Sequence, residues 1–276
     1  MLKFLENYAE HVEEAYNSAP KIKIKKRINK IVVGGMGASA IPGDILRSYL
    51  DEDLDIPIFV ERRYKMPKFI DKNTLVFMIS YSGNTEESLA MLKSARRRGC
   101  QIILLTSDGK FSRKKGLPII KVPTGHVPRV AFPYLFFPIL KVLADNKLIK
   151  NQDKNVKEVI SVVKKFDHEK SREIAKKFFR RMPLLYGPEE YRGALYRWQT
   201  QLNENSKKLA HYNCFTEMNH NEIVSDFEDN KDAFAIVLYD KNVYKRVLLQ
   251  MKLSMKILSK EIETMKIRPK GKSLLA

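Results

Sequence analysis

The sequence has no long hydrophobic run and little cysteine, and each absence removes a class of protein. No apolar run in the 276 residues approaches the roughly 18 that a membrane-spanning helix needs, so we expect no membrane partner. Cys100 and Cys214 are the only cysteines, and they form neither a Cys-x-x-Cys pair nor a metal-ligand spacing. We therefore expect two reduced, partly buried thiols and no metal site.

The N-terminal segment is poor in the features of a targeting peptide. Four glutamates lie within its first 20 residues, at Glu6, Glu10, Glu13 and Glu14. Signal and transit peptides avoid acidic residues, so the segment predicts a cytoplasmic protein.

The chain carries a formal net charge of +19, and its basic residues are spread out rather than gathered in one tract. A basic protein attracts either nucleic acid or small anions. The short basic runs at 21–27 and 96–98 lie beside apolar segments, and no zinc-finger, recognition-helix or RNP-type pattern is present. We interpret the lysines as solvated faces and expect no nucleic-acid partner.

The first half of the sequence alternates apolar runs with helical patterns. Five continuous apolar runs occur, at 29–35, 57–61, 73–80, 101–107 and 117–122. Continuous rather than alternating runs are typical of parallel strands that are covered on both faces. Helical patterns at 41–50 and 86–98 separate them, the second closed by Gly99. This order predicts a doubly wound α/β domain with a parallel sheet.

The second half repeats this plan with fewer strands. A polar stretch rich in Lys and Asn at 145–157 follows an apolar helix at 130–144, which predicts a link between domains 1–150 and 151–276. Further strands are expected at 182–188, 233–239 and 261–267, and further helices at 154–165, 168–181 and 242–259.

Two of the predicted strands end in loops of small residues. The first leads into GGMGASA (34–40) and the third into SYSGNTEES (80–88). Ligands bind at the carboxyl ends of parallel strands, and glycines let the backbone approach an anion at a helix N-terminus. We therefore predict a phosphate-binding site that includes the hydroxyls of Ser80, Ser82 and Thr85. Asn84 is expected to cap the helix that follows. An ordinary turn followed by a capped helix is the alternative.

The glycine loop also permits a different ligand. Gly35, Gly37 and Ala40 satisfy the dinucleotide-binding G-x-G-x-x-A, and Glu61 ends the second strand, where an acid binds a ribose hydroxyl. An NAD-binding Rossmann oxidoreductase therefore stays open. That motif alone is a weak signal, and it leaves SYSGNTEES unexplained.

Four separated segments together resemble one family. The pair of glycine and SYSGNT loops is typical of the sugar isomerase (SIS) fold, and GGMGASAIPGD (34–44) is similar to a segment of the archaeal bifunctional phosphoglucose/phosphomannose isomerases. PRVAFPYL (128–135) and residues 199–223 are similar to two more segments of that family, in the same order. The resemblance implies two SIS-type, flavodoxin-like, doubly wound parallel-sheet domains.

The resemblance also implies a reaction and the residues that perform it. The enzyme would interconvert glucose 6-phosphate and/or mannose 6-phosphate with fructose 6-phosphate through a cis-enediol, with neither metal nor cofactor. Arg129 would stabilise the enediolate, Glu204 would carry the proton between C1 and C2, and His220 would help open the ring from the neighbouring subunit of a homodimer. The substrate phosphate would lie against Gly37, Ala38, Ser39, Ser80, Ser82 and Thr85.

The chemistry is consistent with these residue types. Isomerisation needs one carboxylate near C1 and C2 and a cation for the oxyanion, and burial raises the pKa of a good general base. We expect Leu202 and Leu209 to desolvate Glu204 in part. From the residues alone, Glu204 fits a surface helix position equally well, Arg129 is one base among many, and His220 fits a cap.

Two departures from the family bear on activity. Ala38 stands where glycine is usual, which predicts a less free backbone. The sequence ends at GKSLLA, where the family continues into a tail with a lysine used in ring opening and a threonine linked to accepting both substrates. Either the chain is truncated, or its ring opening is weaker or is done differently, and a non-catalytic phosphosugar-binding module stays open as an alternative.

Overall fold

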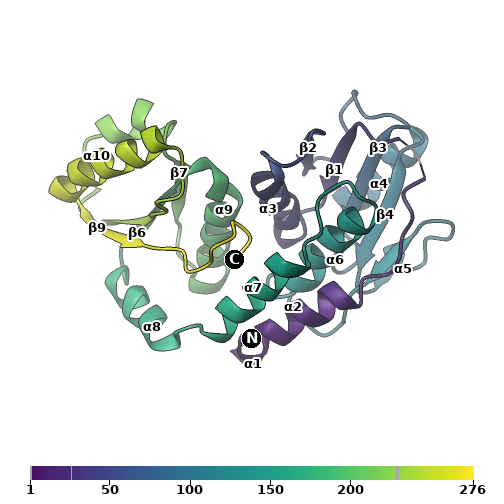
Figure 1. The fold of residues 1–276 in the computed structure, drawn as a ribbon, viewed down its shortest axis with the longest axis horizontal. Coiled ribbons are helices and arrows are strands. Elements are labelled where there is room, and N and C mark those ends of the chain that lie inside the picture. The colour runs from purple at the N-terminus through teal and green to yellow at the C-terminus, as the bar shows by residue number, and fades with distance from the viewer. Residues whose placement is uncertain (1, 26, 228–229) are drawn as a thin grey trace. The chain divides into compact units, whose positions relative to one another are not determined.

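A computed structural model describes residues 2–25, 27–227 and 230–276 of the chain (Figure 1). The chain forms two compact units, Met1–Lys164 and Lys165–Leu274, and each is described by itself. Within the described ranges, no helix combines the length and the apolar character needed to cross a membrane.

The first unit contains a five-stranded parallel sheet. Its strands are β1 (Lys30–Gly34), β2 (Ile58–Glu61), β3 (Thr74–Ile79), β4 (Gln101–Thr106) and β5 (Ile119–Lys121). Its helices are α1 (Leu2–Glu6), α2 (Tyr8–Asn17), α3 (Ile41–Leu50), α4 (Glu86–Arg97), α5 (Gly109–Ser112), α6 (Phe132–Asp145) and α7 (Asp153–Lys164). The strand order is β2-β1-β3-β4-β5, and all pairs are parallel.

Helices cover both faces of this sheet. Val32 of β1 packs in one core cluster with Val76, Met78 and Met91, the last from α4. The next residue, Val33, faces the other way and lies against Gly43 of α3. All six residues of β3 are buried, which explains its continuous apolar sequence. The expected doubly wound α/β architecture is confirmed.

The polar stretch that the sequence assigns to a link begins in contact with the first unit. Tyr16 donates a hydrogen bond to Asp153 (2.8 Å) and Tyr49 donates one to Gln152 (2.6 Å). Val156 and Val159 of α7 are buried. The structure therefore divides the chain after Lys164, later than the expected boundary at residue 150, because two tyrosine hydroxyls bind side chains that look like solvated linker residues.

The second unit contains a four-stranded parallel sheet in the order β7-β6-β8-β9. Its strands are β6 (Met182–Gly187), β7 (His211–Cys214), β8 (Ala233–Leu238) and β9 (Glu263–Ile267). Its helices are α8 (His168–Lys177), α9 (Arg192–Gln201) and α10 (Lys245–Glu261), with a π-helical turn at Leu202–Ser206. The sequence does not predict β7, because this short edge strand has the polar sequence HYNC and is mostly half-buried.

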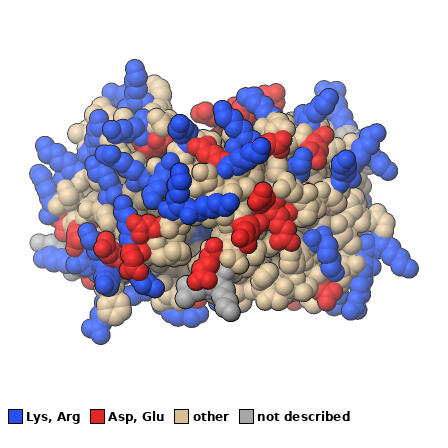
Figure 2. Space-filling view, turned by 60° about the horizontal axis from the view of Figure 1, so that its bottom comes forward, with Lys and Arg blue, Asp and Glu red and all other residues tan. Residues whose placement is uncertain are grey.

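Charged residues are interspersed over the surface. Figure 2 shows a face on which Lys and Arg are spread widely, with Asp and Glu between them. On this face the excess of basic residues forms no single tract, as the spacing along the sequence suggests.

Candidate functional site

The two loops of small residues lie side by side. Strands β1 and β3 are paired neighbours, with Gly34 opposite Met78 at their carboxyl ends. The strand β2, which lies between them in sequence, lies on the outer side of β1. In a sheet of this order the chain reverses its winding between the first and third strands, and the loops there form a ligand site. Residues 35–40 and 80–85 occupy that place.

Three of the predicted hydroxyls are held at this edge by hydrogen bonds. Ser80 and Thr85 lie 3.0 Å apart, oxygen to oxygen, and Ser39 accepts a hydrogen bond from the backbone N–H of Tyr81 at 3.3 Å. Ser39 and Ser80 are buried. Ser82 is exposed on the turn and accepts from the N–H of Asn84 at 3.3 Å.

The glycine loop has the backbone geometry of an anion-binding turn. Residues Gly37–Ser39 form a 3-10 turn immediately before α3, and Gly37 is its left-handed residue (φ +52°). Ala38 is not among the residues with positive φ. Alanine at position 38 therefore imposes no left-handed strain, and the reduced backbone freedom that the sequence suggests has no cost in this conformation.

The helix after SYSGNT begins differently from the prediction. Thr85 occupies the N-cap position of α4, and no side chain makes a capping bond there. Asn84, the predicted cap, instead accepts a hydrogen bond from the N–H of Lys110 at 3.1 Å. The prediction for Asn84 is wrong because a loop from elsewhere in the chain binds its side chain.

That second loop, residues 106–110, braces the SYSGNT turn and is missed by the sequence analysis. Ser107 donates to the carbonyl of Tyr81 through both its hydroxyl (2.6 Å) and its N–H (2.9 Å). Gly83 (φ +68°) packs so tightly that a Cβ there would lie 1.8 Å from the carbonyl oxygen of Asp108. The signal in the sequence is the pair Thr106-Ser107 at the end of an apolar run. In the structure both residues are fully or almost fully buried.

Arg129 lies at the same edge of the first sheet. It is half-buried in the loop between β5 and α6, where the N–H of Val130 donates to the carbonyl of Val127 at 3.0 Å. Because β5 is parallel to β1 and β3, its following loop emerges at their carboxyl side. The structure thus brings Arg129 and the hydroxyl loops to one edge of the first unit.

In the second unit, Glu204 lies on the π-helical turn that follows α9. Its side chain is half-buried, Leu202 beside it is buried, and Lys207 ends the turn in a left-handed conformation (φ 55°). Single π turns are frequent at functional sites. Leu209 is 80% exposed, so it does not contribute the desolvation expected of it.

His220 lies in a different part of the second unit. It ends a 3-10 turn after β7, Met218–His220, and its side chain is exposed. Its neighbour Asn219 is fixed by a hydrogen bond from the hydroxyl of Ser254 on α10 (2.6 Å). The turn is therefore anchored while the imidazole faces outward.

A cluster around Glu222 is a second feature that the sequence analysis misses. The carboxylate accepts hydrogen bonds from Tyr186 (3.0 Å), from His211 Nε2 (3.0 Å) and from Asn213. Burial acts to raise the pKa of Glu222, but the hydrogen bonds from His211 and Asn213 outweigh it and lower that pKa. The signal is the alternation His-Tyr-Asn at 211–213, which places two polar side chains on one face of a strand.

The NAD-binding alternative and the expectation of no metal site can each be compared with the structure. Both oxygens of Glu61, the candidate ribose ligand, accept hydrogen bonds from Arg63, at 2.9 and 2.8 Å. Across the described part of the chain, no three His, Cys, Asp or Glu side chains gather in a way that could hold a metal ion.

Comparisons with known proteins agree with this arrangement. The SIS domain family matches residues 24–123, and the family described as bacterial phospho-glucose isomerase C-terminal SIS domain matches residues 167–276. The chain is similar in fold to glucosamine-6-phosphate deaminase of Thermotoga maritima, with a TM-score of 0.75, 14% identity, and coverage of 99% of this chain and 86% of that one.

The relatives found by sequence share a higher identity with this chain than that solved structure does. The bifunctional phosphoglucose/phosphomannose isomerase of Caldicellulosiruptor bescii is 34% identical over 92% of this chain and 81% of its own length. A D-glucosamine-6-phosphate 4-epimerase of Sulfolobus acidocaldarius is 32% identical over 79% of this chain and 72% of its own length. The Caldicellulosiruptor relative covers more of both chains, and the second unit matches the phospho-glucose isomerase family. This chain belongs to the family of bifunctional phosphoglucose/phosphomannose isomerases.

Proposed function

We propose that this protein is an aldose–ketose isomerase that interconverts glucose 6-phosphate and/or mannose 6-phosphate with fructose 6-phosphate. The observation that carries the proposal is the set of hydroxyl side chains where β1 and β3 end side by side. Buried Ser39 and Ser80, with Thr85 3.0 Å from Ser80, lie there beside glycine-bearing turns. Family membership supplies the class of reaction.

In the first unit, the substrate phosphate is bound at this edge. Backbone N–H groups at Gly37 and Ala38 and the hydroxyls of Ser82 and Thr85 face it, and Ser39 and Ser80 fix the two loops. Arg129, at the same edge, is placed to neutralise negative charge that develops on the sugar during the reaction.

The proton transfer is assigned to Glu204. Its carboxylate takes the proton from C2 of the open-chain aldose, which leaves a cis-enediolate whose oxyanion Arg129 stabilises. A proton moves from O2 to O1, and return of the first proton to C1 then gives the ketose, so the carboxylate is regenerated and no atom is gained or lost. The half-buried position of Glu204 on a π turn supports this role.

His220 is assigned to ring opening in a homodimer. Its exposed side chain on an anchored turn supports a contact with a second copy of the chain. We propose a cytoplasmic dimer with the site at the interface. Light scattering of the purified protein tests the dimer, and a monomer that retains full turnover would contradict it.

The decisive test of function follows each sugar by proton NMR in D2O. With glucose 6-phosphate or mannose 6-phosphate, we expect fructose 6-phosphate to appear with deuterium at C1, and the reverse reaction to place deuterium at C2 of the aldose. Binding of these sugars without turnover would instead support a phosphosugar-binding module.

A second candidate reaction comes from the Sulfolobus relative, which is named as an epimerase. Incubation with glucosamine 6-phosphate separates the two, because epimerisation inverts C4 and leaves C1 and C2 unexchanged. Inversion at C4 without isomerisation of the neutral sugars would overturn the proposed function.

A further inference from the structure

Tyr81 lies inside the phosphate-binding loop, and its backbone is fixed without help from its side chain. Its N–H donates to the hydroxyl of Ser39 at 3.3 Å, and its carbonyl accepts from the hydroxyl and N–H of Ser107 at 2.6 and 2.9 Å. The residue is only 7% exposed. The loop therefore has its own anchors on two neighbouring segments.

The Tyr81 side chain points to a third segment. Its hydroxyl donates to the carbonyl of Pro123 at 2.8 Å and accepts from the N–H of His126 at 2.9 Å. One oxygen atom thus bridges both ends of residues 123–126. This short segment turns at Gly125 (φ +84°) and leads directly to Arg129.

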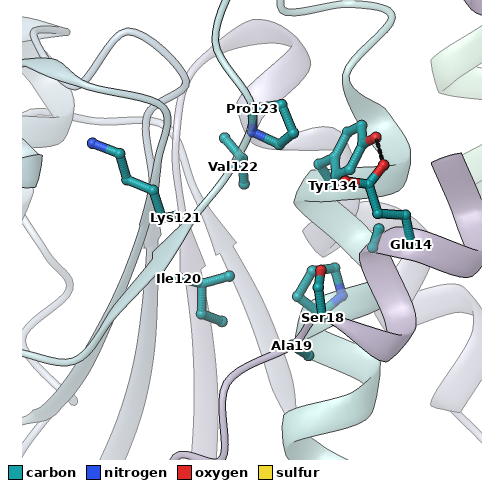
Figure 3. Close-up of a pocket in the computed structure, with 10 residues that line it drawn as sticks. Glu14, Ser18, Ala19, Ile120, Lys121, Val122, Pro123 and Tyr134 are labelled. Carbon is teal, nitrogen blue, oxygen red and sulfur yellow. Dashed lines mark hydrogen bonds between the residues drawn. The ribbon is translucent and has the colours of Figure 1, made fainter.

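The other side of this segment is open. A cavity of about 200 Å³ lies between the end of β5 and the helices α2 and α6. Figure 3 shows Val122 and Pro123 on one side of it, with Tyr134 and Glu14, joined by a hydrogen bond, on the other. Side chains do not fill this space, so packing from α2 does not fix Pro123 there, whereas the hydroxyl of Tyr81 binds its carbonyl directly.

We propose that the Tyr81 hydroxyl is a positioning group that sets the separation between the phosphate-binding loop and Arg129. The inference rests on the proposed function, in which one loop binds the phosphate and the other carries the cation for the enediolate. A bound sugar reacts only when both ends are held in register, and a displacement of about 1 Å costs on the order of a hundredfold in rate.

The test is Tyr81→Phe, which removes one oxygen and keeps the buried ring. We expect kcat to fall about 10- to 100-fold, while KM and the Kd for inorganic phosphate stay within about twofold of wild type. Tyr64→Phe is the matched control, since Tyr64 is 50% exposed on the same unit, and it should leave kcat unchanged. An unchanged kcat in Tyr81→Phe would overturn the inference.

Two further measurements separate positioning from general loosening. In a double-mutant cycle, Arg129→Lys should lower kcat much less in the Tyr81→Phe background than in wild type, whereas additive losses would overturn the proposal. Hydrogen exchange of peptides covering residues 123–131 should be faster in Tyr81→Phe, and equal exchange would also overturn it. Hydrogen exchange can be measured without enzyme activity. Absence of turnover in the wild-type protein would therefore refute the proposed function, while the exchange result would still test the link between Tyr81 and residues 123–126.

Discussion

The carboxylate of Glu222 and the imidazole of His211 form an ion pair in the second unit, with Nε2 and Oε1 3.0 Å apart. The hydrogen bond to Glu222 raises the pKa of His211 above its ordinary 6.5. Hydrogen bonds from His211 and Asn213 outweigh the effect of burial and lower the pKa of Glu222 below 4.5. The two shifts make the stability of this unit depend on pH in opposite directions.

We predict that this pair stabilises the fold most between about pH 4.5 and 6.5. A histidine whose pKa is higher in the folded state stabilises the fold fully at pH values below its unfolded pKa, and this stabilisation is lost as pH rises through the folded pKa. A carboxyl whose pKa is lower in the folded state stabilises the fold at pH values above its unfolded pKa, and this stabilisation is lost as pH falls through the folded pKa.

The measurement is the melting temperature of wild type and His211→Gln across this range. The difference between them should be largest near about pH 5.5 and shrink by about pH 9. The pH-dependent part of the difference in free energy of unfolding between the two proteins should stay below about 1 kcal/mol, because the His211 side chain is 43% exposed and solvent screens the pair. His168→Gln, an exposed histidine on α8, serves as control. A difference that does not vary with pH would contradict the assignment.

Glu204→Gln should remove turnover and leave the fold intact. The amide keeps the size of the side chain and cannot accept the C2 proton, so we expect kcat to fall about 10²- to 10⁴-fold. Thermal melting should be nearly unchanged because Glu204 is only half-buried. Glu261→Gln, an exposed site at the end of α10, is the control. Near wild-type kcat in Glu204→Gln would remove this residue as the base.

Gly83→Ala should damage the SYSGNT loop beyond the cost of a left-handed alanine. Gly83 (φ +68°) and Gly116 (φ +76°) have similar backbones, but a Cβ at 83 would lie 1.8 Å from the carbonyl of Asp108, whereas 116 faces open space. In urea denaturation we expect Gly116→Ala to cost about 1–2 kcal/mol, and Gly83→Ala to cost more. Millimolar phosphate should raise the melting temperature of Gly116→Ala but not of Gly83→Ala; equal behaviour would contradict the loop assignment.

Cys214 should resist alkylation in the folded protein. Burial raises the pKa of its thiol to about 12, so at pH 8 only about 10⁻⁴ of it is the reactive thiolate. Mass spectrometry after iodoacetamide treatment should find Cys214 unmodified until the protein is denatured. Cys100, which is half-buried, provides the internal reference. Equal labelling of both cysteines under native conditions would contradict the burial of Cys214.

Much of the architecture is readable from local pattern. All eight strands predicted from the sequence correspond to strands of the structure, and the small-residue loops after β1 and β3 are found where predicted. The ninth strand, β7, is missed because an edge strand needs few apolar residues: His211, Tyr212 and Asn213 are only half-buried. Asn84 is assigned to a cap because helix-start statistics are local, whereas its actual partner, Lys110, is 26 residues away.

The order of apolar runs and glycine turns by itself determined a parallel, doubly wound sheet with loops of small residues at two strand ends, because strand burial and backbone freedom depend on neighbouring residues. Tertiary structure alone decided that Ser107 braces Tyr81 and that Glu222 accepts hydrogen bonds from Tyr186, His211 and Asn213. The reason is physical: these contacts join residues whose separation along the chain is set by the folding of whole elements, and a buried polar group is satisfied by whichever partner that folding brings within hydrogen-bonding distance.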